Sequence, residues 1–98
     1  MNEENIIIKK EDGHASVMLK GSLTLPNVGA IKAEFDKLVK DTKSIIVETS
    51  EVEEADLSFY QLIVSLKSHC KTHSIDIITK IELPQDLSQL LTKTGLKF

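Results

Sequence analysis

A serine at the predicted start of a helix is the residue whose chemistry this sequence defines best. Residues 56–62, Asp-Leu-Ser-Phe-Tyr-Gln-Leu, lie between a short apolar run and a long amphipathic run. We expect the helix to begin at Ser58, where a hydroxyl would meet the unpaired N–H groups of the first turn. A helix N-terminus also favours anions. Ser58 is therefore interpreted as a helix cap, as a residue that accepts a phosphate, or as both.

Other reactive side chains form no recognisable catalytic or metal site. His69 and His73 lie four residues apart on one predicted helical face, but no fourth zinc ligand accompanies them and Cys70. Cys70 falls on the apolar stripe of that helix, where a free cysteine packs as a small hydrophobe. The acidic stretch 48–56 does not match the ligand spacing of an EF-hand and is interpreted as a solvated loop. We predict no metal and no cofactor.

No catalytic pattern is present either. The four glycines are scattered along the chain, and neither H-E-x-x-H nor G-x-S-x-G occurs. His69 and Cys70 are neighbours in sequence, and such neighbours do not face each other on a helix. We therefore predict that the protein is not an enzyme.

The composition limits the compartment and the partners. The 98 residues, of which 41% are hydrophobic, are predicted to form one domain over residues 1–98. A net charge of -3 and 4% aromatic residues argue against binding to nucleic acid. The apolar run 6–8 is far too short to insert into a membrane, and a single cysteine fits a reducing compartment. We expect a cytoplasmic protein.

Hydrophobic periodicity predicts the elements that position Ser58. Residues 6–10 and 15–20 are strand-like and flank a hairpin turn signal, Asp12-Gly13. The helical period recurs over residues 26–40 and from Ser58 to about residue 72, and residues 45–47 are typical of a strand buried on both faces. Residues 75–78 form the last strand, and Leu83-Pro84 precedes a short final helix.

The resulting order, β-β-α-β-α-β-α, predicts an α/β fold. Right-handed crossovers between buried strands give a mixed four-stranded sheet, parallel after the first hairpin and packed with three or more helices. Ser58 would then lie beyond the carboxyl end of a strand, where such sheets place their sites. The inner face of its helix is expected at Phe59, Leu62, Ile63, Leu66 and Cys70, with Tyr60 and Val64 at the margins.

Residues 45–58, Ile-Ile-Val-Glu-Thr-Ser-Glu-Val-Glu-Glu-Ala-Asp-Leu-Ser, resemble the core motif of STAS domains without a gap. That motif is an apolar strand, an acidic residue, a Val four residues later, and Asp-x-Ser opening a helix. Gly21-Ser22-Leu23 and the closing pattern in residues 83–96 are also similar to the family. The family includes anti-sigma-factor antagonists and cytoplasmic domains of sulfate transporters. The resemblance covers nearly the whole chain and implies a STAS-like fold.

The resemblance also implies a role for the serine. In the antagonists, a partner anti-sigma kinase phosphorylates the second Ser of Asp-Ser-Ser-Gly, and the unphosphorylated form binds that partner. Ser58 matches this phosphoacceptor. Here a Leu replaces the first Ser and a Phe replaces the Gly, so that Phe is either a docking contact or an inward core residue. The implied partner-binding residues are Asp56, Leu57, Ser58, Phe59, Tyr60 and Gln61.

Three functions follow from these observations. The favoured one is a regulatory domain that docks to a kinase-type anti-sigma partner under the control of Ser58. The second is a scaffold or adaptor that acts without phosphorylation in a chemotaxis or other bacterial signalling complex. The third is a sensor that binds a small ligand or nucleotide at the strand ends. Glu51, Glu53 and Glu54 would favour a basic partner surface.

Overall fold

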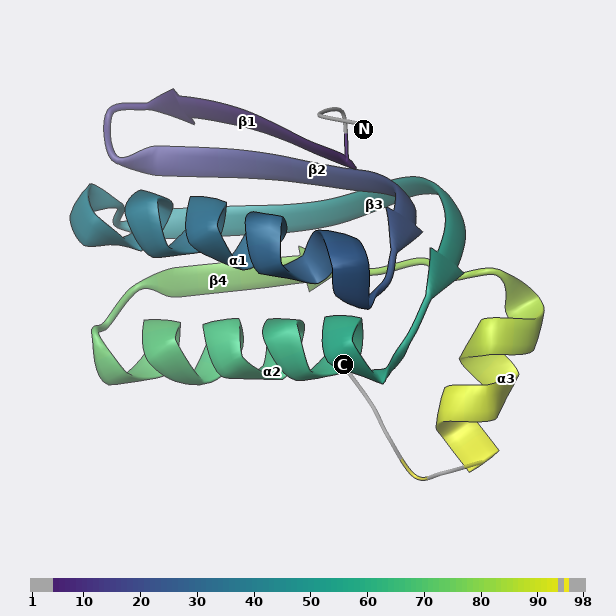
Figure 1. Ribbon diagram of the computed structural model, residues 1–98. Coiled ribbons are helices and arrows are strands. Elements are labelled where there is room, and N and C mark those ends of the chain that lie inside the picture. Colours follow the sequence, from purple (N-terminus) through teal and green to yellow (C-terminus); the bar gives the residue numbers. More distant parts are fainter. Residues whose placement is uncertain (1–4, 94, 96–98) are drawn as a thin grey trace.

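The computed structural model describes residues 5–93 and residue 95, in which a four-stranded sheet packs beside two long helices (Figure 1). Thr94 and Leu96, which belong to the predicted closing pattern, lie outside the described residues. The elements in chain order are β1 (Ile6–Glu11), β2 (His14–Leu23), α1 (Leu25–Leu38), the 3-10 turn η2 (Val39–Asp41), β3 (Ser44–Ala55), α2 (Leu57–Thr72), β4 (Asp76–Lys80) and α3 (Gln85–Lys93).

The sheet has the strand order β1-β2-β3-β4. The first pair is antiparallel and the two following pairs are parallel. This arrangement confirms the predicted α/β fold, a mixed sheet with helices in β-β-α-β-α-β-α order. Asp12 and Gly13 both have positive φ, at 53° and 83°, and close the first hairpin with two residues, as a type I′ turn requires.

The core fills one face of the sheet. Because successive strand side chains alternate between faces, Val17, Leu19 and Val47 point together and are completely buried. The helix α1 connects β2 to β3, and α2 connects β3 to β4. Because both connections join adjacent parallel strands and such crossovers are right-handed, the two helices lie on the same face of the sheet. Ile46 points to the opposite face and is only half-buried, so the prediction of a strand buried on both faces is wrong. The helices contribute Val28, Ile31, Phe35, Leu38, Phe59, Leu62, Ile63, Leu66 and Cys70 to this core.

The acidic stretch is a strand, not the predicted loop. β3 continues to Ala55 and stays paired with β2, although the register shifts twice. Lys20 pairs with Ser50 and Gly21 with Val52, so one residue, Glu51, bulges out, and a second bulge follows. The exposed glutamates do not oppose strand formation here because their side chains reach solvent while the backbone finds partners in β2.

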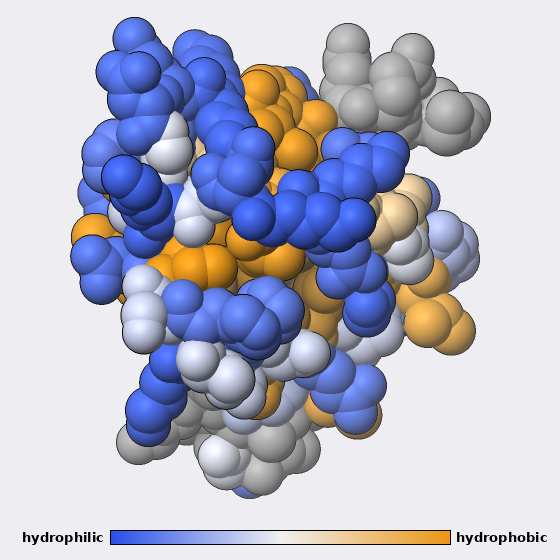
Figure 2. Space-filling model, turned by 90° about the vertical axis from the view of Figure 1, so that its left-hand side faces the viewer, coloured by the Kyte–Doolittle hydropathy of each residue, from blue (hydrophilic) through white to orange (hydrophobic). Residues whose placement is uncertain are grey.

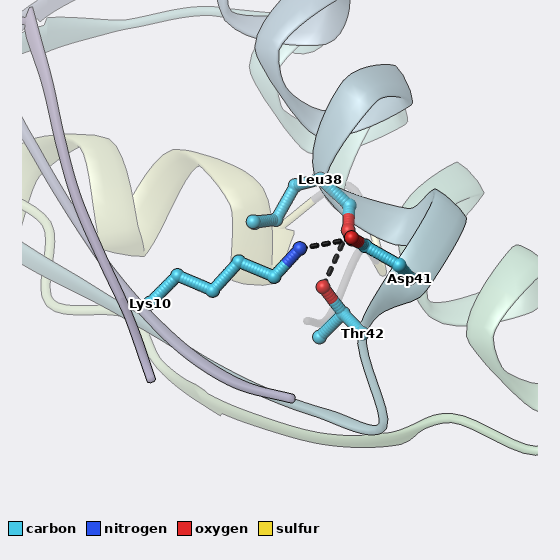
Figure 3. Close-up of polar contacts among 4 residues, drawn as sticks. All are labelled: Lys10, Leu38, Asp41 and Thr42. Atoms are coloured by element: carbon cyan, nitrogen blue, oxygen red, sulfur yellow. Dashed lines mark hydrogen bonds and ion pairs between the residues drawn. The ribbon is translucent and has the colours of Figure 1, made fainter. Parts of the chain in front are cut away.

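Polar contacts stabilise the end of the fold at which the β1–β2 turn lies. Figure 3 shows that the Lys10 ammonium contacts the Asp41 carboxylate, which joins β1 to η2. The hydroxyl of buried Thr42 donates to the carbonyl of Leu38 and so satisfies a polar group inside the fold. Figure 2 views the molecule from this end and shows mostly hydrophilic residues with apolar surface between them.

Candidate functional site

The candidate site lies at the sheet edge where β2, β3 and β4 end and where α1 and α2 begin (right-hand end of Figure 1). One residue, Thr24, separates β2 from α1, and one residue, Asp56, separates β3 from α2. Since the two strands are adjacent and parallel, the first turns of both helices are brought to the same edge. This edge therefore gathers the first-turn N–H groups of both helices, whose bonding partners must come from outside the regular helical pattern.

Asp56 is the residue that organises this edge. It is the N-cap of α2, and its Oδ1 accepts hydrogen bonds from the backbone N–H of Ser58 at 3.0 Å and of Phe59 at 3.4 Å. Its Oδ2 accepts from the N–H of Leu25 at 3.0 Å, at the first residue of α1. One carboxylate thus caps its own helix and holds the start of a helix 31 residues away in sequence.

Ser58 is not the helix cap that was predicted. It is the second residue of α2, and its hydroxyl donates to Asp56 Oδ1. Asp56 takes the capping position because its side chain reaches the N–H groups two and three residues later, and because its charge opposes the positive end of the helix. The hydroxyl of Ser58 is therefore held against a carboxylate at a half-buried position.

The hydrogen bonds also set the protonation of Asp56. Partial burial raises the pKa of its carboxyl, but the Ser58 hydroxyl and the N–H groups of Leu25, Phe59 and Ser58 together outweigh this effect, and the net pKa lies below the usual value. All four donors favour the charged form. Asp56 is consequently ionised at neutral pH and carries the negative charge closest to the Ser58 hydroxyl.

The six predicted partner-binding residues divide by exposure. Asp56, Leu57 and Gln61 are exposed, whereas Ser58 and Tyr60 are half-buried. The side chain of Phe59 is completely buried in the core, so the alternative of an inward core residue is confirmed and that of a docking contact is wrong. It occupies the third position of α2, which turns toward the sheet, and the apolar stripe of the helix begins there.

Several residues that support the edge were not predicted. Leu25 is linked to Asp56 as described above. Asn27 donates to the carbonyl of Ser22 at 2.8 Å, and buried Asn5 donates to the carbonyl of Lys20 at 2.9 Å across the bulged part of β2. The hydroxyl of Thr49 donates to the carbonyl of Glu82 at 3.0 Å and accepts from its N–H at 2.7 Å, which ties β3 to the segment before α3. These contacts were missed because no pattern of neighbouring residues in the sequence indicates which distant residues will be in contact.

The helix α2 places the other reactive side chains away from this edge. Cys70 is buried, and burial raises the pKa of its thiol, so it packs as an apolar group. The rings of His69 and His73 stack with centroids 4.2 Å apart. Within residues 5–93 and 95, no group of three or more His, Cys, Asp or Glu side chains is arranged to hold a metal ion.

Two surface hollows also lie away from Ser58. One is lined by α1 and α2 between Lys32 and His69, and the other is lined by residues around the β1–β2 turn, including His14 and Ser44. Neither lies at the carboxyl ends of β2, β3 and β4, where a small-ligand sensor was expected to bind. Across the described part of the chain, no helix has the length and apolar character needed to cross a membrane.

Known structures with the same fold include an anti-sigma factor antagonist. The chain superposes on the Bacillus cell fate determinant SpoIIAA in its phosphorylated form with a TM-score of 0.71 and 15% identity, over 93% of this chain and 84% of that one. For the anti-sigma factor antagonist SpoIIAA in its unphosphorylated form, the TM-score is 0.67 at 12% identity, over 93% of this chain and 99% of that one. These likenesses establish a shared fold.

The same fold also occurs within longer chains. Mglu superposes with a TM-score of 0.65 and 14% identity, over 80% of this chain but only 19% of Mglu, so the chain spans about a fifth of that protein's length. No curated protein sequence matches the chain. The family profile described as "Mlab, STAS domain" matches residues 7–97. The chain therefore belongs to the STAS domain family.

Proposed function

We propose that this STAS domain is a regulatory docking domain that binds a protein partner of the anti-sigma type, and that phosphorylation of Ser58 controls the binding. The observation that carries this proposal is the position of the Ser58 hydroxyl, in the first turn of α2 and bonded to Asp56. The likeness to SpoIIAA supports it, because SpoIIAA is described as an anti-sigma factor antagonist with a phosphorylated form. The domain acts in the cytoplasm and performs no catalysis.

The local electrostatics give phosphorylation a physical effect. A phosphoserine has lost the proton that Ser58 donates to Asp56, and it adds about -1.5 to -2 charge beside that carboxylate. The N–H groups of the first turn, which would otherwise receive a phosphate, are already bonded to Asp56. The phosphate therefore competes with Asp56 for these donors, and the docking edge changes in charge and in shape.

Mass mapping tests the switch. The chain is incubated with ATP and a cognate anti-sigma kinase, and the modified residue is identified after digestion. We expect a single phosphate on Ser58 and none on the Ser58→Ala variant. A phosphate at another residue, or no phosphate, refutes this mechanism.

A binding assay tests its consequence. Ser58→Asp is compared with Ser58→Ala for binding to the same partner. The negative variant should weaken binding at least tenfold, whereas the alanine variant should bind as the unmodified chain does. Equal binding by both variants contradicts control at Ser58.

A second candidate is constitutive docking in a signalling scaffold. The observation in its favour is the apolar Leu57, which is 52% exposed next to Ser58 and offers a contact that needs no phosphate. For a scaffold, Ser58→Asp should leave the affinity within about twofold, because less than 0.5 kcal/mol would change. The same comparison of Ser58 variants therefore separates the two candidates.

A further inference from the structure

Two exposed leucines lie at the docking edge. Leu25 is 69% exposed and Leu57 is 52% exposed, and each is the first residue of its helix. Asp56 accepts a hydrogen bond from the N–H of Leu25 and precedes Leu57 in the chain, so one carboxylate holds both first turns. Single exposed apolar residues are ordinary on a protein surface, but a pair held together at a candidate site indicates an interaction surface.

Exposed carboxylates lie beside this pair, on the strand that leads to Asp56. Glu51, Glu53 and Glu54 are exposed at the bulged end of β3, next to the ionised Asp56. Residues 44–66 contain no Lys, Arg or His. The nearest cation on the paired strand is Lys20, which lies opposite Ser50 before the bulges. Asp56 already offsets the positive ends of the two helices, so the edge combines two apolar side chains with the acidic end of β3.

We propose that Leu25 and Leu57 form the apolar centre of a docking surface for a basic amphipathic helix of the partner protein. A helix of this kind presents an apolar strip to the leucines and Lys or Arg side chains to the nearby carboxylates. Apolar anchors supply most of the affinity, and complementary charge sets orientation and association rate. The inference relies on the proposed function for the location of the docking edge, but it does not rely on phosphorylation.

An NMR titration tests this surface. The ¹⁵N-labelled chain is titrated with a synthetic peptide of about five helical turns that carries Leu on one face and Lys and Arg on the other. A matched peptide carries Glu in place of Lys and Arg. The basic peptide should shift the amide signals of Leu25 and Leu57, and the acidic peptide should shift neither. Shifts centred elsewhere, or equal binding by both peptides, refute the proposal.

Alanine variants identify the anchors. Leu25→Ala and Leu57→Ala should each weaken binding of the basic peptide about tenfold, which is the loss expected of a moderate anchor. Ile78→Ala is the matched control, because Ile78 is 54% exposed on β4 outside this edge, and it should bind as the unmodified chain does. All three variants remove exposed side chains, so their unfolding midpoints should agree with one another. A control that loses as much affinity as the leucine variants refutes the assignment.

The outcomes separate this inference from the proposed function. If the basic peptide binds at the leucines and mass mapping finds no phosphate on Ser58, the docking surface is supported and the switch is refuted. Docking of the cognate partner that depends on Ser58 but is unchanged by Leu25→Ala and Leu57→Ala supports the switch and refutes the leucine surface.

Discussion

Replacing Asp56 with alanine should reveal how much one carboxylate contributes to the edge. The change removes the N-cap of α2, which is worth about 1 kcal/mol within a range of roughly 0.5–2 kcal/mol. It also removes the bond to the N–H of Leu25, for which a net value of about 1 kcal/mol is expected. The total loss is about 2 kcal/mol, which corresponds to a decrease in Tm of roughly 8–16 °C for a domain of this size.

Urea denaturation at pH 7 measures this loss, with Asp36→Ala as the control. Asp36 is exposed and makes only an i,i+4 ion pair with Lys32 among the described residues, which is worth about 0.3–0.5 kcal/mol. A loss in Asp56→Ala no larger than that of Asp36→Ala would refute the double-capping argument. Asp56→Asn retains an oxygen that can accept and should lose less than the alanine variant.

The charge of Asp56 adds a pH signature to the same experiment. Its pKa is lower in the folded chain than in the unfolded chain, so the unfolded state binds the proton first on acidification. The stability that the charge provides is therefore complete above the unfolded value of about 3.9 and is lost as the pH falls through the folded value. The difference between the unmodified chain and Asp56→Asn should be constant near neutrality and decrease in acid. A difference that grows on acidification contradicts this assignment.

Substitutions at three further positions test the fold by chemical denaturation. Phe59→Ala should lower the free energy of unfolding by about 3–5 kcal/mol because it empties a completely buried site, and a loss below 1 kcal/mol would contradict that burial. Ser74→Gly should raise it by about 0.5–1 kcal/mol, since the residue has φ 58° at the end of α2, where Ile75 N–H bonds to the Cys70 carbonyl; a decrease would refute this. Glu51→Gly should also raise the free energy of unfolding because φ is 52° at the bulge, whereas Glu51→Val should lower it by about 1–2 kcal/mol because a β-branched residue fits this conformation poorly; equal effects would disprove strain there.

The elements of this fold are predictable where their signals are local. Asp12-Gly13 defines its turn through the backbone preferences of two adjacent residues. The inner stripe of α2 from Phe59 to Cys70 follows from helical spacing alone, and all five predicted inner residues are buried. Val64, expected at the margin of that stripe, is 40% exposed.

The features that were missed depend on contacts distant in sequence or on a local motif that fits two readings. The acidic part of β3 is a strand only because β2 offers it backbone partners, and composition cannot show that pairing. The Asp-x-Ser motif indicates a helix start, but both residue types cap helices, so the motif does not choose between Asp56 and Ser58. The link from Asp56 to Leu25 requires knowledge of how β2 and β3 pair, which no local pattern contains.

The burial of Phe59 has a consequence for any enzyme that modifies its neighbour. Ser58 cannot be drawn out as an extended peptide unless the adjacent aromatic ring leaves the core, and that local unfolding costs much of the stability of the domain. A modifying enzyme must therefore recognise the intact helical turn rather than a flexible sequence motif. Short peptides that contain residues 56–62 should be poor substrates even when the folded chain is a good one.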